Sequence, residues 1–236
     1  MRRIALALVV VALVGITGMS QYFYAFYHDN TPGKDVEINL TNTMPWAADV
    51  LINMYDADGD LIWTDRASLA ANAGGYWALS DHVPAYNLNF GVVTVESSER
   101  LIIGLEYFAN GQLVSIDTVY SELPSLDTGE LFWLGTYYTQ VAPAFTGMIL
   151  MNPWDFPAAC TVTAYDVYGN VVYTQDFVLS AHEAVFGDLR DVLGQSGTMW
   201  GHLDVQMQDR AVIMAMEYYN RGCSQLEIDN VTDYYF

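Results

Sequence analysis

The 236-residue chain has very little positive charge, with eight Lys and Arg residues against 28 Asp and Glu residues, and Lys34 is its only lysine. Nucleic-acid-binding proteins neutralise phosphates with clustered Lys and Arg, so a formal net charge of −20 argues against that class of partner. The same scarcity argues against docking to anionic membranes through a polybasic patch. Disorder is not expected either, because aromatic residues make up 14% of the chain and charged residues only 15%.

Signatures of catalysis are also lacking. No two of the four histidines stand at ligand spacing on a common element, whereas a zinc site needs three or four ligands. There is no Gly-x-Ser-x-Gly nucleophile elbow. The best-placed acids are Glu106 and Glu217, each followed by a tyrosine. We interpret them as strand-edge acids that pair with Arg100 or Arg210, and we expect a protein without enzymatic activity.

An uncharged apolar run from Ile4 to Met19 follows a pair of arginines at the N-terminus. This pattern is typical of a secretory signal peptide, which we assign to residues 1–20. The alternative is a retained membrane anchor, because the uncharged stretch continues to Tyr27 and exceeds the about 20 residues that span a bilayer. Both interpretations predict export to the periplasm, the cell surface or the extracellular space. Membrane contact is then expected only through this segment, and only if it is not cleaved.

The rest of the chain contains one unit twice, at a spacing of 110 residues. Identities at this offset include Asn42/Asn152, Ala48/Ala158, Tyr55/Tyr165, Asp56/Asp166, Gly59/Gly169, Leu69/Leu179, Gly91/Gly201, Val95/Val205 and Arg100/Arg210. One inserted residue then shifts the match, so that Glu106-Tyr107 corresponds to Glu217-Tyr218. We infer a tandem duplication, with repeat 1 over residues 21–125 and repeat 2 over residues 134–236.

Each repeat has the sequence pattern of β-structure. The runs Val50–Tyr55 and Cys160–Tyr165 are rich in β-branched and aromatic residues, and an Asp-x-x-Gly turn follows each of them. About six such runs per repeat favour an antiparallel β-sandwich. A single helical turn is expected near Asp188–Leu193. The pattern resembles the tandem immunoglobulin-like modules of many secreted microbial surface proteins, which implies an all-β fold of two β-sandwich domains.

The acidic turn of repeat 1 is a candidate metal site. Asp56, Asp58 and Asp60 alternate on a tight loop, and Ca²⁺ binds several oxygen ligands of this kind. Repeat 2 replaces Asp58 with Tyr168 but keeps the Asp and Gly that close a hairpin turn. A plain hairpin is therefore the favoured interpretation, and no cofactor is expected apart from possible Ca²⁺.

Exposed tryptophans beside loop prolines indicate a candidate ligand surface. Trp46 and Trp154 occupy corresponding loops, two positions apart in register. Sugar-binding β-sandwich modules use flat aromatic rings as platforms, although packing in the core or in a turn is the favoured interpretation, because tryptophan is largely buried on average.

The expected function is that of an exported, non-catalytic structural or adhesion protein. One alternative is a carbohydrate- or ligand-binding module. Another is a self-assembling filament or appendage subunit, in which the aromatic termini Gln21–Tyr27 and Val231–Phe236 complete a neighbour's sheet. The expected partners are accordingly other surface proteins, glycans or copies of the chain.

The two cysteines, Cys160 and Cys223, both fall in repeat 2, and an exported chain favours a disulfide between them. The bridge would close a loop of about 64 residues and stabilise the fold by roughly 4 kcal/mol. Mass spectrometry after alkylation of the denatured protein, with and without reductant, checks this prediction. We expect alkylation only after reduction, and two alkylated thiols in the non-reduced sample would contradict it.

Overall fold

The computed structural model describes residues 22–86, 89–119, 131–141, 144–193, 198–208, 211–219, 225–231 and 234–235. The fold is all-β, with four antiparallel sheets of four or five strands and the short helix α2 (Leu189–Leu193). The signal peptide or anchor expected at residues 1–20 lies outside the described residues. Among the residues that are described, no helix has the length and apolar character needed to cross a membrane.

Repeat 1 forms two sheets, in which neighbouring strands follow the orders β1-β6-β3-β4 and β5-β2-β7-β8. The strands are β1 (Tyr22–Asp29), β2 (Lys34–Asn42), β3 (Ala48–Tyr55), β4 (Leu61–Leu69), β5 (Gly74–Ala78), β6 (Phe90–Ser97), β7 (Leu101–Ala109) and β8 (Gln112–Val119), with the 3-10 turn η1 (Leu79–Asp81) after β5.

Repeat 2 has the same order of strands, in sheets β12-β11-β14-β9-β17 and β13-β10-β15-β16. Its strands are β9 (Leu131–Val141), β10 (Phe145–Met151), β11 (Ala158–Asp166), β12 (Val171–Leu179), β13 (Ala184–Asp188), β14 (Thr198–Gln208), β15 (Ile213–Tyr219), β16 (Gln225–Val231) and β17 (Tyr234–Tyr235). The registers also agree, because Tyr27 faces Val92 in repeat 1 while Tyr137 faces His202 in repeat 2.

Local sequence explains most of these strands. Along β3, buried and more exposed side chains alternate, as expected for a strand with one face in a core. The Asp-x-x-Gly turns close as the sequence predicts, since the amide of Gly59 donates to the carbonyl of Asp56 and Gly169 does the same with Asp166. The expected helical turn near residue 188 is α2.

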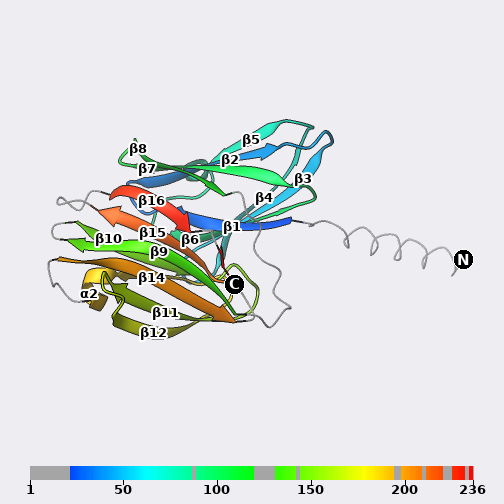
Figure 1. Ribbon diagram of the computed structural model, residues 1–236. Coiled ribbons are helices and arrows are strands. Elements are labelled where there is room, and N and C mark those ends of the chain that lie inside the picture. Colours follow the sequence, from blue (N-terminus) through cyan, green and yellow to red (C-terminus); the bar gives the residue numbers. More distant parts are fainter. Residues whose placement is uncertain are drawn as a thin grey trace, which may run out of the picture.

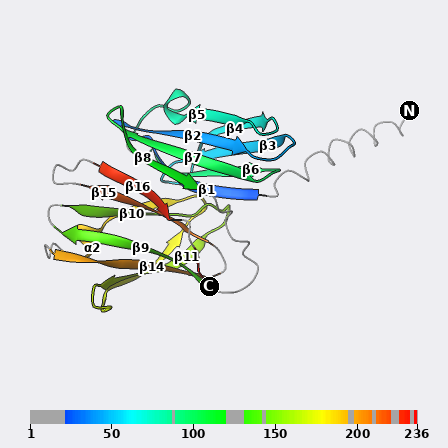
Figure 2. The same ribbon diagram turned by 45° about the horizontal axis from the view of Figure 1, so that its top comes forward.

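The two repeats pack face to face. Strands β10, β15 and β16 lie between repeat 1 and the sheet of β9, β14 and β11 (Figure 1; Figure 2). The outward side chains of this middle sheet belong to the same hydrophobic cluster as the core of repeat 1: Ile149, Met151, Ala184, Ile213, Ala215 and Ile228. Full burial of each large apolar side chain stabilises by about 1.5–3 kcal/mol. One hydrophobic cluster therefore extends from the core of repeat 1 onto the outer face of repeat 2, while the interior of repeat 2 has a separate cluster around Leu150, Val162 and Leu203.

The strands that form the contact between repeats differ in sequence from strands with one exposed face. Strand β10 is buried at every position, and β1 at its last six, because both faces of each strand are covered. These strands accordingly have nearly continuous apolar sequences instead of alternating ones.

Two equivalent glycines offer a test of the contact. Gly59 and Gly169 both have positive φ, at 85° and 82°, and a left-handed conformation costs other residues about 1–2 kcal/mol. A Cβ on Gly59 would lie 2.4 Å from the carbonyl oxygen of Ala181 in repeat 2, whereas a Cβ on Gly169 would meet nothing within 4 Å. We expect Gly59→Ala to destabilise the protein by about 1–3 kcal/mol more than Gly169→Ala, because only Gly59→Ala overpacks the contact. Urea denaturation of both variants measures the difference, and equal losses would contradict the packing described here.

Candidate functional site

The loops that carry the predicted tryptophans are held by equivalent buried asparagines. The side-chain amide of Asn42 donates to the carbonyl of Trp46 at 2.7 Å, and that of Asn152 donates to the carbonyl of Phe156 at 2.7 Å. Trp46 therefore corresponds to Phe156 and not to Trp154. Asparagine fits this position because one amide group reaches several loop carbonyls at once.

The structure gives the two tryptophans different surroundings. Trp46 is 51% exposed. The indole N–H of Trp154 instead donates to the carbonyl of Ala211 at 2.7 Å, and its ring lies 5.0 Å from that of Phe23 in repeat 1. Of the two predicted ligand-binding residues, Trp46 is thus the one that offers an open ring.

The acidic turn uses its first carboxylate to hold its own backbone. One oxygen of Asp56 accepts hydrogen bonds from the amides of Asp58 and Asp60, and the other accepts from the hydroxyl of Tyr86 at 2.9 Å. In repeat 2, Asp166 holds the equivalent turn, and the bonds it accepts, first those from Asn170, lower its pKa. Within the described residues, no group of three or more His, Cys, Asp and Glu is arranged to hold a metal ion. Calcium binding by Asp56, Asp58 and Asp60 stays a prediction.

The same turn is part of the contact between repeats. The carbonyl of Ala57 accepts a hydrogen bond from the amide of Ala184 at 3.1 Å. Beside it, the ring of Tyr55 stacks on that of His182, with centroids 3.7 Å apart. The sequence predicts a hairpin here but does not reveal that the hairpin docks against repeat 2.

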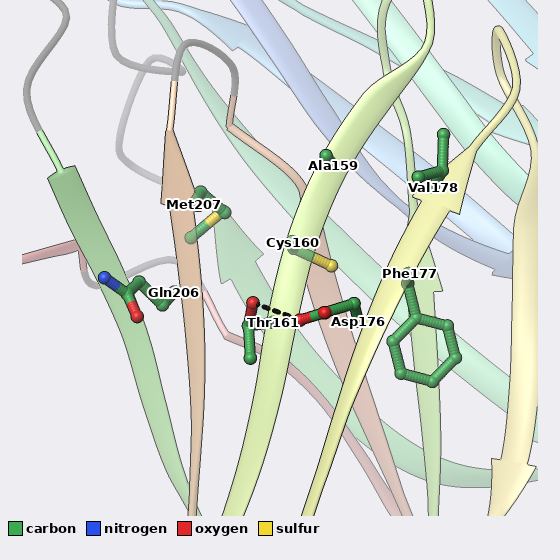
Figure 3. A pocket seen from close by; sticks show the side chains of 8 residues that line it. All are labelled: Ala159, Cys160, Thr161, Asp176, Phe177, Val178, Gln206 and Met207. Atoms are coloured by element: carbon green, nitrogen blue, oxygen red, sulfur yellow. Dashed lines mark hydrogen bonds between the residues drawn. The ribbon is translucent and has the colours of Figure 1, made fainter.

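Cys160 lies on β11, beside a pocket whose other lining residues come from β11, β12 and β14 (Figure 3). At the same pocket, the hydroxyl of Thr161 donates to Asp176 at 2.7 Å. Burial raises the pKa of the Cys160 thiol to about 12, so the thiol is not activated as a nucleophile. Its predicted partner, Cys223, lies outside the described residues, and the disulfide stays a prediction.

The most unusual site is a buried cluster of charged and phenolic groups between the repeats. The ammonium of Lys34 lies 2.5 Å from a carboxylate oxygen of Asp29 and 3.4 Å from one of Glu217. Asp29 is 2% exposed and Glu217 is 1% exposed. We call these three residues, together with Tyr27 and Tyr219, the interface cluster. The only lysine of the chain thus joins an acid of repeat 1 to an acid of repeat 2.

Two tyrosines complete the cluster. The hydroxyl of Tyr27 donates to Glu217 at 3.1 Å and also lies 3.2 Å from Asp29, while the hydroxyl of Tyr219 donates to the other oxygen of Glu217. Burial raises the pKa of Glu217 above its ordinary value, although the charge of Lys34 acts in the opposite direction. From sequence alone we expected Glu217 to pair with an arginine. The structure instead brings Glu217 to Lys34. In the sequence, Lys34 stands out only as the single lysine of a very acidic chain, and nothing there predicts its partner.

A second hydrogen-bond network adjoins the interface cluster and covers the edge of β1 at Tyr27. The amide of Tyr27 donates to the side-chain carbonyl of Asn230 at 2.8 Å, and the hydroxyl of Tyr107 donates to the carbonyl of Tyr27 at 2.8 Å. The side-chain amide of Asn230 in turn donates to Tyr107 and to Asp117. Both backbone groups of Tyr27 on this edge therefore already have partners and cannot pair with another chain.

In repeat 2, the surface equivalent to the contact face of repeat 1 is open to solvent. It contains a hollow lined by residues that include Tyr137, Asp166, Val167, Trp200 and His202. The corresponding residues of repeat 1 are Tyr27, Asp56, Ala57, Phe90 and Val92. Tyr137 is 49% exposed, whereas Tyr27 is 2% exposed. The exposed aromatic rings of this hollow thus correspond to a docked surface in the other repeat.

At some positions the open faces have polar residues where the faces in contact have apolar ones. In the sheet β5-β2-β7-β8, Asn39 and Thr41 stand where the covered face of repeat 2 has Ile149 and Met151. In repeat 2, His202 likewise stands where repeat 1 has Val92. Polar outer faces of this kind are typical of the terminal units of a repeat array.

Both terminal segments pair within the chain. Tyr22–Asp29 forms β1 beside β6, and Tyr234–Tyr235 forms β17 beside β9. In the part of the chain that is described, both segments thus belong to the sheets of their own repeats, and self-assembly through them stays a prediction.

No protein-family model matches the chain, and no curated protein matches it. A solved structure of Thermotoga maritima 1070 is similar, with 14% identity and a TM-score of 0.33 over 44% of this chain and 93% of that one. A Bacteroides uniformis beta-glucuronidase matches with 10% identity and a TM-score of 0.18 over 88% of this chain and 25% of its own. A glycosyl hydrolase family 2 member from Bacteroides cellulosilyticus matches with 8% identity and a TM-score of 0.19, over 89% of this chain and 27% of its own. Similarities at this level carry no argument about function.

His28 gives the contact region a predictable dependence on pH. The ring Nε2 of His28 donates to the carbonyl of Tyr55 at 2.8 Å, and burial lowers the pKa of the ring to about 4. The folded state therefore binds the proton more weakly than the unfolded chain. The stability that the neutral ring of His28 contributes is therefore fully present above pH 6.5. It is lost as the pH falls from 6.5 towards 4, which lowers the free energy of unfolding by about 3 kcal/mol in all.

His28→Gln keeps a side-chain donor and removes the titration, so we expect a shallower loss of stability between pH 6.5 and 4 than in the wild type. Denaturation at a series of pH values measures it, with His202→Gln, at a half-exposed site, as the matched control. Identical profiles for the wild type and His28→Gln would contradict the assignment.

Proposed function

We propose that this chain is an exported, non-enzymatic structural protein of a cell surface, built from two tandem immunoglobulin-like β-sandwiches that act as one rigid unit. The observation that carries this proposal is the continuous hydrophobic cluster shared by the two repeats. Flexibly linked domains move relative to one another by default, whereas a large apolar interface fixes their orientation. A fixed pair of domains suits a spacer or scaffold that holds a partner at a set distance from the cell.

The titratable groups support the same proposal. His28 bonds a backbone carbonyl from a fully buried position, and the Cys160 thiol has a raised pKa. Catalytic groups need pKa values close to the working pH, and neither of these residues meets that condition. Lys34 is likewise committed to carboxylates between the repeats. The acidic surface suits solubility outside the cell.

Export and surface display are tested with the full chain expressed in a bacterial host, beside a matched variant that lacks residues 2–20. We expect only the full chain to become accessible to added protease on intact cells. N-terminal sequencing then separates a chain cleaved before Gln21 from one that retains its anchor. Recovery of both proteins in the cytoplasm, protected from protease, would contradict the proposal.

A carbohydrate- or ligand-binding role is the second candidate, and the exposure of the equivalent loop aromatics Trp46 and Phe156, at 51% and 59%, favours it. A glycan array probes it with the wild type, Trp46→Ala and Trp154→Ala. If the loop of repeat 1 binds sugar, Trp46→Ala lowers the affinity at least tenfold, because stacking on the ring is lost. Trp154→Ala, whose ring packs within the protein, keeps the binding. An array with no signal, or equal binding by all three proteins, would remove this candidate.

A further inference from the structure

The interface cluster places an amine beside a carboxyl group with a second carboxyl group in reach. The Nζ atom of Lys34 is 2.5 Å from Oδ2 of Asp29 and 3.4 Å from Oε1 of Glu217. We propose that Lys34 and Asp29 condense into an intramolecular amide bond, with Glu217 carrying the protons that the reaction moves. Such a bond is a covalent modification that the chain makes by itself, and it is independent of the proposed function.

The atoms balance without any other reagent. The ammonium of Lys34 and the carboxylate of Asp29 become one amide and one water molecule, and the charge of the pair is zero before and after. Glu217 takes a proton from the ammonium and passes it through the hydroxyl of Tyr27 to Oδ2 of Asp29, and the free amine then attacks Cγ of the neutral carboxyl group. The N–Cγ bond forms, the bond from Cγ to Oδ2 breaks, and Oδ2 leaves as water with two protons that came from the nitrogen. Glu217 ends as it began.

Hydrogen bonds to Asp29 distinguish its two oxygens: Oδ1 stays in the amide and Oδ2 leaves as water. Oδ1 accepts from the amide of Thr31 at 3.0 Å and from the hydroxyl of Thr31 at 2.6 Å. These two donors stabilise the negative charge that develops on Oδ1 when the amine adds to Cγ. Oδ2 lies within 3.2 Å of the hydroxyl of Tyr27, which also donates to Glu217. The leaving oxygen and the proton carrier are therefore joined through Tyr27.

The surroundings favour the condensed product. Asp29, Glu217 and Tyr27 are each at most 2% exposed, so bulk water is kept from the reacting carboxyl group. Burial raises the pKa of Glu217 above its ordinary value, which makes its carboxylate a better acceptor for a proton. Burial acts to lower the pKa of Lys34, but the charges of Glu217 and Asp29 raise it, so the ammonium gives up its proton only to a group inside the interface cluster. Lys34 itself keeps 24% of its side-chain surface and borders a hollow beside Gly33 and Asn110, through which the released water can leave.

Because the chain has a single lysine, any lysine label found in the protein reports on Lys34 alone. The purified full chain is denatured and treated with an amine-reactive acylating reagent, then digested with trypsin and analysed by mass spectrometry. We expect Lys34 to be unreactive and the peptide that contains Asp29 and Lys34 to be lighter by one water molecule. In a second sample, digested without labelling, we expect the bond after Lys34 to resist trypsin. A labelled Lys34, in a peptide that has gained the mass of the label and lost no water, overturns the proposal and leaves a salt bridge only.

Two matched variants assign the role of Glu217. Glu217→Gln keeps the size of the side chain but cannot carry the protons, so we expect Lys34 to become labelled and the loss of one water molecule to disappear from that peptide. Glu106→Gln changes the equivalent acid of repeat 1, which is not part of the interface cluster, and we expect the bond to form as in the wild type. If Glu217→Gln forms the bond as completely as Glu106→Gln, the role of Glu217 is wrong. If Glu217→Gln does not fold, Tyr27→Phe takes its place, because it removes the link between Oδ2 of Asp29 and Glu217. We expect Tyr27→Phe to form the bond at least tenfold more slowly than the wild type. An unchanged rate would overturn the role of Glu217 as proton carrier.

Discussion

Burial of the outer face of β10 and β15 against repeat 1 is the interaction on which the rest of the structure depends. It covers Ile149, Met151 and Ile213, which an isolated repeat 2 would expose to water. It also explains why the hairpin at Asp56 docks against the chain near Ala184 instead of standing free. The two repeats are thus joined through one of their two hydrophobic clusters, and they do not stand as independent units.

The same burial requires partners for the polar groups that the contact between repeats removes from water. A charge removed from water needs a partner and further hydrogen bonds, since an unpaired buried ion is strongly destabilising. Glu217 meets this requirement through Lys34, Tyr27 and Tyr219, and Asn230 satisfies the edge of β1. The single lysine of the chain thus lies beside two buried carboxylates, where its charge compensates theirs. Elsewhere its acids lie mainly at the surface, where water solvates them.

Local patterns in the sequence predict the strands but not their assembly. The β-branched run at Val50–Tyr55 and the Asp-x-x-Gly turns depend only on near neighbours, so an all-β fold with repeated hairpins is readable from residues alone. The contact between repeats depends instead on differences between equivalent positions, such as Asn39 against Ile149, which a search for identities overlooks. The loop tryptophans show the same limit: Trp46 and Trp154 look paired in sequence, yet Asn42 and Asn152 place Trp46 opposite Phe156. The apolar run at Met148–Met151 was the available signal, since strands covered on both faces lose their alternation.

The polarity of the two open faces has a consequence for the evolution of the chain. A contact between unlike faces of equivalent units can in principle be extended without end, because each added copy offers a new free face. Here the free faces have diverged, with Asn39 and Thr41 at one end and His202 at the other. If the two halves of the gene were exchanged, these polar side chains would be pressed together and the apolar ones left in water. The order of the copies is therefore fixed, and a further copy could dock only on a free face whose polar positions had become apolar.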